Sequence, residues 1–365
     1  MDFRLTDEQS ALRTSARSLL TAECPIDLIR ARYADVTAVP ERLSAALGDQ
    51  GWLRLLVPEE HGGLGLGIVE LCLVLEEAGR ALVPAPLWST AGLFVPLAGA
   101  ATAGDLRADL LTRVSADGLR GTAAIAEEDG RWSLASASTM ATAKGDGWRL
   151  NGLKRLVPEA DSAAVLLVSA QAPDGIDVFA VDRDAVTTRW IETVDRSRAV
   201  YDVTLQDAPA RRLDVDPAAA ETALEIATVS LAAELLGAAR WILDTTVGYA
   251  KVREQFGVPI GSFQAVQHMC ADDLLDLERA GAAVYWAAMC LDADDEASAR
   301  ATAIAKASTG DAARHTAKDG IQIHGGIGYT YEHDLHLYIR RVYAAESLLG
   351  GADEQRDKLA DLLAL

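Results

Sequence analysis

Two segments in the last third of the chain carry residues that suit a phosphate-bearing ligand. The first spans residues 249–260 and reads YAKVREQFGVPI, with one helix predicted to end at Gly257 and the next to begin after Pro259. The guanidinium of Arg253, just before this break, can donate two parallel hydrogen bonds to phosphate oxygens. The ring of Phe256 can pack on a flat ligand. A helical hairpin with a solvated arginine explains the same residues equally well.

The second segment spans residues 322–330 and reads QIHGGIGYT. Successive glycines after a helix, here Gly325 and Gly326, let another molecule approach the backbone closely. One glycine after a helix is an ordinary cap, but a pair followed by Gly328 exceeds what capping requires. His324 is compatible with a core position and with a ligand contact.

The charge balance restricts which ligands the surface can attract. The 365 residues include 34 Lys and Arg against 54 Asp and Glu, which gives a formal net charge of -20. Such a surface repels nucleic acid and anionic membranes, so neither is an expected partner. An anionic ligand therefore needs its own locally basic pocket.

The remaining composition predicts a soluble cytoplasmic protein. Residues 1–4 lack the basic-then-apolar pattern of a signal peptide. No stretch is judged apolar for the roughly 20 residues that cross a bilayer. No metal site is expected, because the four cysteines show no metal-type spacing: Cys24, Cys72, Cys270 and Cys290.

The elements that must position the two segments fall into three regions. Up to about residue 110 the pattern is helical, with a capping box predicted from Thr6 to Gln9 and a glycine-rich loop at residues 58–65. A functional role for that loop is the less favoured interpretation. After Pro217 the chain returns to helix, with long helices expected to follow at about residues 264–290 and 297–321.

The middle region reads as an antiparallel sheet or a small barrel. Turn dipeptides favour tight hairpins there: Asp146-Gly147, Asn151-Gly152 and Asp174-Gly175. Short β-rich runs lie nearby, at residues 163–169, 176–181, 187–193 and 199–205. The fold class is therefore α+β.

The two segments, in this order and about 70 residues apart, resemble the Arg-x-Gln-Phe-Gly and Gln-x-x-Gly-Gly-x-Gly motifs of the acyl-CoA dehydrogenases. Residues 58–65 (PEEHGGLG) and 146–154 (DGWRLNGLK) are similar to two further motifs of that family. The resemblance covers essentially the whole chain. It implies an N-terminal helical domain at residues 1–115, a middle antiparallel β-domain at 116–215 and a C-terminal four-helix bundle at 216–365.

The resemblance implies a cofactor, FAD, shared with a neighbouring subunit. Seven cofactor contacts carry over to this chain, with Gln255 the weaker candidate: Arg253, Gln255, Phe256, Gln264, Gln322, Gly325 and Gly326. The implied activity is α,β-dehydrogenation of an acyl-CoA thioester with hydride transfer to FAD. The implied partners are an acceptor of the electron-transfer flavoprotein type and, within a homo- or hetero-oligomer, a homologous chain.

No catalytic base can be assigned. In most of the family the base is the glutamate of a Glu-Gly-Thr stretch, and Gly350 stands at its position. In other members it lies on the long helix before the Arg motif, a position that falls near Ala227. Five carboxylates lie near these positions in sequence and are predicted to be solvated or helix-end charges: Glu225, Glu234, Glu346, Asp353 and Glu354.

The family's flavin-contacting stretches also differ here. Residues 125–130 read IAEEDG in place of Thr-Glu-Pro with Gly and Ser, and residues 156–159 read LVPE in place of Trp with Ser or Thr. The hydroxyl that would bind the flavin edge is missing from both. Glu127 and Glu128 would also bring negative charge toward an anionic cofactor.

Three hypotheses follow from this mixture of matches and departures. The chain is an active FAD-dependent acyl-CoA dehydrogenase with a displaced base. Alternatively, it is a catalytically silent subunit that completes the FAD site of an intact homologue, as in the shorter subunit of actinobacterial heterotetrameric steroid and sterol side-chain acyl-CoA dehydrogenases, which it resembles. The least favoured is flavin-dependent oxidation of a compound other than a thioester. The sequence does not specify the acyl group.

Overall fold

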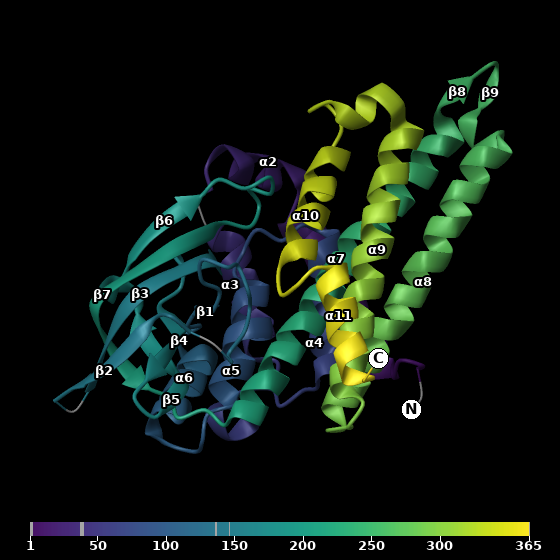
Figure 1. Cartoon of the computed structure of the whole chain (residues 1–365). Coiled ribbons are helices and arrows are strands. Elements are labelled where there is room, and N and C mark those ends of the chain that lie inside the picture. The colour runs from purple at the N-terminus through teal and green to yellow at the C-terminus, as the bar shows by residue number, and fades with distance from the viewer. Residues whose placement is uncertain (1–2, 37–39, 136, 146, 365) are drawn as a thin grey trace. The chain divides into compact units, whose positions relative to one another are not determined.

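The computed structural model describes residues 3–36, 40–135, 137–145 and 147–364 (Figure 1). They form two compact units. We call Met1–Ile29, Cys72–Val83 and Val229–Leu365 the helical unit, and Arg30–Leu71 with Pro84–Thr228 the sheet unit. The helices α2 (Ile26–Ala34), α4 (Ile68–Arg80) and α7 (Pro217–Val252) each contribute residues to both units.

The helical unit consists of α1 and the long C-terminal helices. Its elements, besides parts of α2, α4 and α7, are α1 (Asp7–Glu23), α8 (Gln264–Asp292), α9 (Ser298–His324), α10 (Leu335–Ser347) and α11 (Ala352–Leu362). Helix α9 packs against α8, α10 and α11 (Figure 1). The predicted capping box of α1 is confirmed, because Thr6 Oγ1 accepts from the Gln9 N–H at 3.2 Å and Gln9 Oε1 accepts from the Thr6 N–H at 3.0 Å.

Helices α4 and α7 cross with their backbones in contact. A Cβ added to Gly79 of α4 would lie 1.8 Å from the carbonyl oxygen of Glu234, and one added to Gly237 of α7 would lie 1.8 Å from that of Glu76. Any side chain at either glycine would therefore push the two helices apart. The crossing fixes the position of the C-terminal half of α7.

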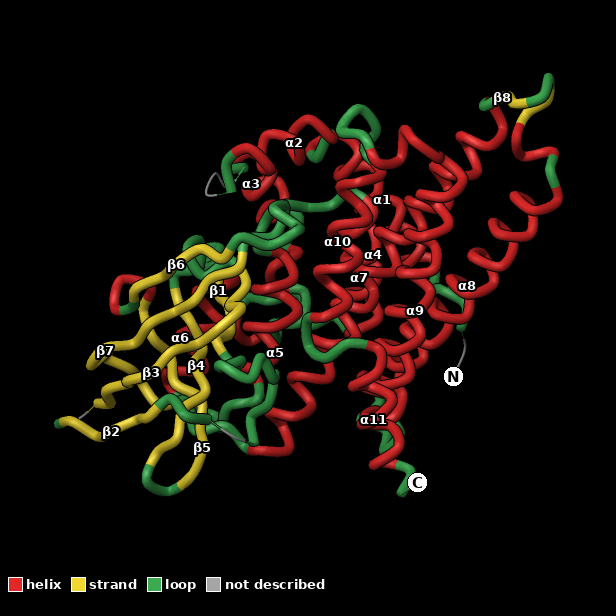
Figure 2. The backbone as a smooth tube through the Cα atoms, turned by 45° about the horizontal axis from the view of Figure 1, so that its top comes forward, coloured by secondary structure: helices red, strands yellow, loops and turns green. Residues whose placement is uncertain are grey.

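The sheet unit contains seven paired strands with helices and short turns around them (Figure 2). The strands are β1 (Gly121–Ala124), β2 (Met140–Lys144), β3 (Gly147–Pro158), β4 (Val165–Ala172), β5 (Gly175–Asp182), β6 (Thr187–Ile191) and β7 (Val200–Arg212). The helical elements are α3 (Glu41–Asp49), α5 (Val95–Gly99), α6 (Asp105–Ala116), the π-helix η3 (Trp88–Phe94) and the 3-10 turns η1 (Trp52–Arg54), η2 (Glu59–His61) and η4 (Arg183–Ala185).

The strand pairings close on themselves, which fits the predicted small barrel. The ring runs β4–β2–β3–β7–β5 and returns to β4. Most pairs are antiparallel as predicted, but β1 and a single residue of β2 pair with β4 in parallel. Alternate side chains of these strands point inward and form a buried apolar core that includes Leu150, Val168 and Phe179.

Of the three predicted turns, one is confirmed and one is wrong. Gly175 begins β5 directly after the β4–β5 turn. The Asn151-Gly152 pair instead lies inside β3, at an irregularity in the pairing with β7. A Cβ at Gly152 would lie 2.5 Å from Thr139 Oγ1, so this glycine permits a close approach rather than a turn. Asp146 lies outside the described residues, although β2 and β3 do pair on either side of it.

The glycine-rich loop at residues 58–65 is a packing feature of the sheet unit. A Cβ on Gly63 would lie 1.9 Å from the carbonyl oxygen of Val57, and Gly62 has a φ of 77°. Both glycines are thus explained by the loop's own backbone.

Helix α7 corrects the expectation that no segment is apolar and long enough to cross a membrane. Its 36 residues meet that length and composition, but 83% of its most apolar window is buried inside the structure. A helix buried to this extent is explained as a core helix.

We expect Gly237→Ala to lower the free energy of unfolding by about 1–3 kcal/mol or more, because the new methyl group cannot fit between the helices. Gly248→Ala on the same helix is the matched control, since its Cβ would meet nothing within 4 Å. The control should be neutral or stabilising by up to about 1 kcal/mol. Urea denaturation measures both, and equal midpoints for the two variants would contradict the close crossing.

Candidate cofactor-binding site

The Arg253 segment forms a small β-hairpin rather than a simple break between helices. Helix α7 ends at Val252, so the predicted end at Gly257 was wrong. Residues Glu254–Gln255 (β8) pair with Val258–Pro259 (β9), and the Ile260 N–H donates to the Arg253 carbonyl at 2.7 Å. The 3-10 turn η5 (Ile260–Ser262) then leads into α8 at Gln264.

The side chains of this hairpin point into solvent. Phe256 is 94% exposed and adopts a φ of 54°, which is uncommon for a residue with a Cβ. Val252 is 75% exposed. Among the described residues, the Arg253 guanidinium has no ion pair or hydrogen bond, and Gln255 Nε2 donates only to the neighbouring Glu254 carbonyl at 2.8 Å. Large apolar groups left this exposed indicate a surface that another molecule covers.

The second segment forms the end of α9 and the turn after it. Helix α9 ends at His324, and Gly325 caps it with a φ of 62°. The turn continues as η6 (Gly325–Tyr329). Gln322, Gly325 and Gly326 are all exposed, and a Cβ on either glycine would meet nothing within 4 Å. The backbone of the turn is therefore open to a ligand.

An aromatic stack brings the two segments together at one end of the helical unit (Figure 1). The ring of Tyr249, in the last turn of α7, stacks on His324 with centroids 4.4 Å apart. Arg253 follows Tyr249 by one helical turn and Gly325 follows His324 directly, so both are anchored to this stack.

His324 belongs to the core rather than to the ligand surface. It is only 4% exposed, and its Nδ1 lies 2.8 Å from the Gly320 carbonyl oxygen. Burial lowers the pKa of His324, and nearby His333 opposes protonation as well. A neutral imidazole that donates from Nδ1 to the carbonyl explains this contact.

These residues fit the diphosphate and adenosine part of a dinucleotide such as FAD. Phosphate oxygens require hydrogen-bond donors, and this end of the unit supplies three kinds. They are the Arg253 guanidinium, the side-chain amides of Gln255, Gln264 and Gln322, and the backbone of the paired-glycine turn. In a chain of net charge -20, such local donors are needed to attract an anion.

The stretch at residues 125–130 contains an ion pair between the half-buried Glu127 and a buried lysine. Lys154 Nζ, on β3 and fully buried, donates to Glu127 Oε1 at 2.7 Å and to Ser169 Oγ at 3.0 Å. Glu127 also accepts from the N–H groups of Ser138 and Thr139, at 2.6 and 2.9 Å. Lys154 therefore neutralises the Glu127 carboxylate, which weakens the predicted repulsion of an anionic cofactor by this residue.

The pKa shifts of the pair reflect these contacts. Partial burial acts to raise the pKa of Glu127, but the hydrogen bonds from Lys154 and Ser138 outweigh it and hold the pKa well below its usual range. Burial lowers the pKa of Lys154, and Glu127 opposes that change. Lys154 and Glu127 therefore form a stable ion pair with each other.

Residues 156–159 also face inward. Glu159 is 6% exposed, has a φ of 53° and accepts a hydrogen bond from the Ser89 hydroxyl of the π-helix η3. Its N–H donates to the Ala199 carbonyl at 2.8 Å. The chain's own polar groups therefore satisfy this position, where the family places a flavin-binding hydroxyl, and neither of the two stretches fits the flavin ring.

Neither of the two expected base positions carries a carboxylate. The backbone conformation at Gly350 and the burial of Ala227 also leave little space for a larger side chain. Gly350 has a φ of 86°, and a Cβ there would lie 2.9 Å from Gln355 Nε2. Ala227 is fully buried, and its carbonyl accepts from Trp88 Nε1 at 3.1 Å. A larger side chain at Gly350 would be strained in this conformation.

Two of the five neighbouring carboxylates are buried, contrary to the prediction that all five are solvated or helix-end charges. Glu225 is 8% exposed and Glu234 is 3% exposed. Glu234 pairs with Arg341 of α10, which is 1% exposed. Sequence analysis missed this pair because a glutamate within a helical pattern gives no sign of a buried arginine on another helix.

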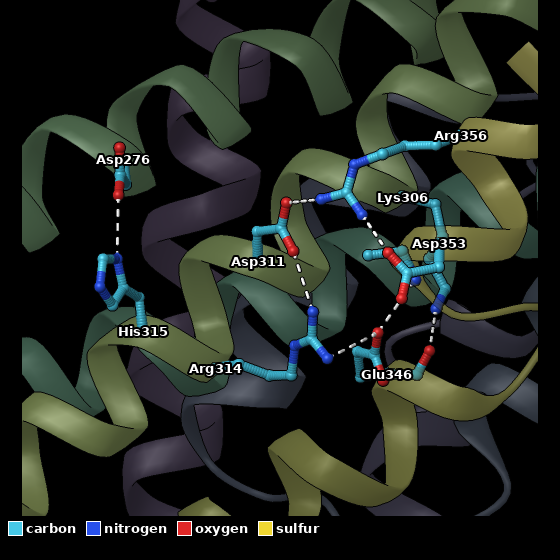
Figure 3. Close-up of polar contacts among 9 residues, drawn as sticks. Asp276, Lys306, Asp311, Arg314, His315, Glu346, Asp353 and Arg356 are labelled. Atoms are coloured by element: carbon cyan, nitrogen blue, oxygen red, sulfur yellow. Dashed lines mark hydrogen bonds and ion pairs between the residues drawn. The ribbon is translucent and has the colours of Figure 1, made fainter. Parts of the chain in front are cut away.

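Of the other three, Glu346 and Asp353 lie where α9, α10 and α11 meet (Figure 3), and Glu354 follows Asp353 in α11. Glu346 lies in the last turn of α10, as predicted for a helix-end charge, and accepts from the Ala352 N–H at 2.9 Å. Asp353 and Glu354 lie in the first turn of α11, as predicted, and Asp353 pairs with Arg356 at 2.6 Å. Lys306, fully buried, donates to the Glu346 carbonyl at 2.6 Å. These contacts tie the two ends of the segment at residues 346–352, which contains Gly350, to each other and to α9.

Comparison with known proteins defines the class. Residues 6–116 match the N-terminal domain of acyl-CoA dehydrogenases, and residues 218–363 match the C-terminal domain. The acyl-CoA dehydrogenase IpdE2 of Mycobacterium tuberculosis is 32% identical over 351 residues, which cover 94% of this chain and 93% of IpdE2. The chain belongs to the acyl-CoA dehydrogenase family, whose members are FAD-dependent.

More specific similarities are to mycobacterial proteins and to two-component complexes. The acyl-CoA dehydrogenase FadE34 of M. tuberculosis is 35% identical over 95% of this chain, which spans only 47% of that longer relative. A variant of the steroid ACAD Tcur3481–Tcur3483 superimposes with a TM-score of 0.87 at 37% identity, over 98% of both chains. The ChsE4–ChsE5 complex of M. tuberculosis gives a TM-score of 0.90 at 27% identity, over 100% of this chain and 99% of the other.

We expect Lys154→Met to lower the free energy of unfolding by about 3–5 kcal/mol, because it leaves Glu127 without its cation. The double variant Lys154→Met, Glu127→Gln should recover part of that loss, because it removes both charges together. Chemical denaturation of the two single variants and the double variant forms the test. Additive losses would show that the two side chains do not interact.

Proposed function

We propose that this chain is one subunit of a hetero-oligomeric, FAD-dependent acyl-CoA dehydrogenase. In this role it completes the FAD site of a homologous chain that carries the catalytic base. The observation that carries the proposal is a contrast within one chain. The diphosphate-binding segments are intact and exposed, whereas both expected base positions and both flavin-edge stretches are closed by the chain's own contacts.

Each proposed contact has a defined task. Arg253 pairs with a phosphate oxygen, and Phe256 covers apolar surface of the cofactor or of the partner. Gln322, Gly325 and Gly326 line the adenosine diphosphate part, and Gln264 and Gln255 add amide hydrogen bonds. FAD, when bound, supplies the hydride acceptor for α,β-dehydrogenation of an acyl-CoA thioester.

The partners and the domain boundaries are part of the same proposal. The Tcur3481–Tcur3483 and ChsE4–ChsE5 names each join two components, which supports a hetero-oligomer, and the steroid ACAD relative supports a steroid-type acyl-CoA as the substrate class. We further propose an electron acceptor of the electron-transfer flavoprotein type and a cytoplasmic location. Domains at residues 1–115, 116–215 and 216–365 would then each have a counterpart in the partner.

A second candidate function is autonomous catalysis with a displaced base. The visible spectrum of the purified chain discriminates the two. We expect a colourless protein when it is expressed alone, and a yellow complex when it is co-expressed with a base-carrying homologue. A yellow preparation of the chain alone that bleaches on addition of an acyl-CoA would overturn the proposal in favour of this second function.

Replacing Arg253 by alanine should reduce flavin retention in the co-expressed complex. Loss of a charged hydrogen bond costs about 1.5–3 kcal/mol, or roughly 10- to 100-fold in affinity. The matched control is Arg300→Ala, because Arg300 is also exposed but lies in the first turn of α9, far in sequence from Gly325. Flavin absorbance per complex after gel filtration is the measurement, and unchanged flavin content in Arg253→Ala would remove this residue from the site.

Gly326→Ala should separate cofactor contact from folding. Because its Cβ would meet nothing within 4 Å and its φ is not in the left-handed region, the thermal stability of the chain alone should stay unchanged. Flavin retention in the complex should fall, since the added methyl group occupies the space into which the ligand's phosphates would approach. A variant that retains flavin like the wild type would show that the turn is not a contact.

A further inference from the structure

The helical unit contains a cavity that is separate from the proposed cofactor contacts. It has a volume of about 470 Å³ and is lined by α1, the start of α2, the end of α4, the middle of α7 and the start of α10. The helices α1, α4, α7 and α10 lie side by side (Figure 2). None of the seven proposed FAD contacts lines this cavity, and Gly350 follows the opposite end of α10, a helix about 20 Å long. Its size is in the range of pockets that hold small molecules.

Two stacked aromatic rings form part of the cavity lining. Trp241 on α7 and Tyr338 on α10 lie parallel, with ring centroids 3.5 Å apart and an angle of 2° between the ring planes. Tyr338 is 3% exposed, and its hydroxyl donates to the Arg80 carbonyl at 2.8 Å. Trp241 is half-exposed. Rings fixed in this way give the cavity a rigid aromatic surface, which favours the packing of a flat ring system.

Uncharged apolar side chains form another part of the lining. The Cys24 thiol donates to the Ala81 carbonyl at 3.4 Å, and burial raises the pKa of this thiol to about 12, so it stays neutral. The other apolar residues of the lining are Leu20, Pro25, Ile26 and Ala81. A ligand with an apolar body would lose contact with water here, which favours binding.

The charged part of the lining has hydrogen-bond donors left over. Arg17 Nε and Nη2 donate to the two carboxylate oxygens of the buried Glu77, at 2.8 and 2.6 Å. Arg80 Nη2 donates to Asp244 at 2.5 Å, and its guanidinium makes no other hydrogen bond among the described residues. Asp334, the remaining acid of the lining, already has an interaction within the chain. Because a guanidinium carries five N–H donors, both arginines can donate further, and a carboxylate is the acceptor that suits them best.

We propose that this cavity is a second ligand site, which binds a fused-ring carboxylic acid in its ionised form. The ring system packs against Trp241, Tyr338 and the apolar residues, and the carboxylate accepts hydrogen bonds from Arg80 and Arg17. Such a ligand contacts helices that meet beside the crossing of α4 and α7, so it should stabilise the helical unit. The proposal does not depend on the function proposed above, because it involves neither FAD nor a partner chain.

The first test is calorimetric titration of the purified full chain with cholate, a four-ring carboxylate, below the concentration at which cholate forms micelles. We expect saturable binding to one site. Methyl cholate, which has the same rings without the charge, should bind at least about tenfold more weakly. Decanoate, which has the charge without the rings, should also bind at least about tenfold more weakly. Absence of cholate binding, or equal affinity for cholate and either of the other two compounds, would overturn the proposal.

A variant that fills the cavity locates the bound ligand. Thr21→Trp introduces a large ring from an exposed position of the lining and should weaken cholate binding at least about tenfold. Thr14→Trp is the matched control, because Thr14 is exposed on the same helix but does not line the cavity. Both hydroxyls donate to the backbone one helical turn earlier, at 2.7 Å for Thr21 and 2.8 Å for Thr14. Cholate should raise the melting temperature of the wild type and of Thr14→Trp only. Undiminished binding by a folded Thr21→Trp would place the ligand elsewhere and end the proposal.

Arg80→Gln separates recognition of the carboxylate from packing of the rings. The affinity for cholate should fall at least about tenfold, whereas the affinity for methyl cholate should stay unchanged. General damage to the cavity would instead weaken the binding of both compounds. An equal loss for the two compounds, or no loss for cholate, would contradict the assigned role of Arg80.

Discussion

The helical unit depends on one contact, the crossing of α4 and α7 at Gly79 and Gly237. Backbones this close leave no space for side chains between them. Carboxylates beside the crossing instead form hydrogen bonds and ion pairs with neighbouring helices. Glu76 binds Arg240 at 2.9 Å and Tyr285 of α8 at 2.6 Å. Arg17 of α1 makes two hydrogen bonds with Glu77, and Arg341 of α10 pairs with Glu234. The three buried carboxylates Glu76, Glu77 and Glu234 thereby bind side chains of α1, α7, α8 and α10 around the crossing. Removing one partner of such a pair leaves a charge uncompensated in the interior, which makes this arrangement rigid.

This rigidity determines where the exposed hairpin lies. The C-terminal half of α7 runs from the crossing to Tyr249, whose stack on His324 fixes the end of α9 beside it. Arg253 and the paired-glycine turn are therefore both anchored to this stack. A preorganised pair of donors binds a diphosphate with less loss of conformational freedom than two mobile loops would.

The sequence predicted the elements better than it predicted the roles of charged residues. Helical periodicity and β-rich runs placed α8, α9 and three strands within a few residues, because these patterns depend on local burial, whereas β7 continues to Arg212, well past the predicted run. The turn predicted at Asn151-Gly152 was wrong because Gly152 is required by the close approach of Thr139, a contact that local turn chemistry does not reveal. The hairpin at residues 254–259 was missed because its strands are two residues each. The partners of Glu127 and Glu234 lie 27 and 107 residues away, beyond any local pattern.

The ion-paired acids of this chain join elements of its own fold. Inside the units they hold helices and strands through Arg and Lys, as Glu234 and Glu127 do. A chain that exposes Arg253 and the paired-glycine turn at one end of its helical unit is suited to the proposed role of completing another protein's site. The departures from the family pattern at Gly350 and Glu159 are consistent with that proposal, in which a partner chain supplies the catalytic base.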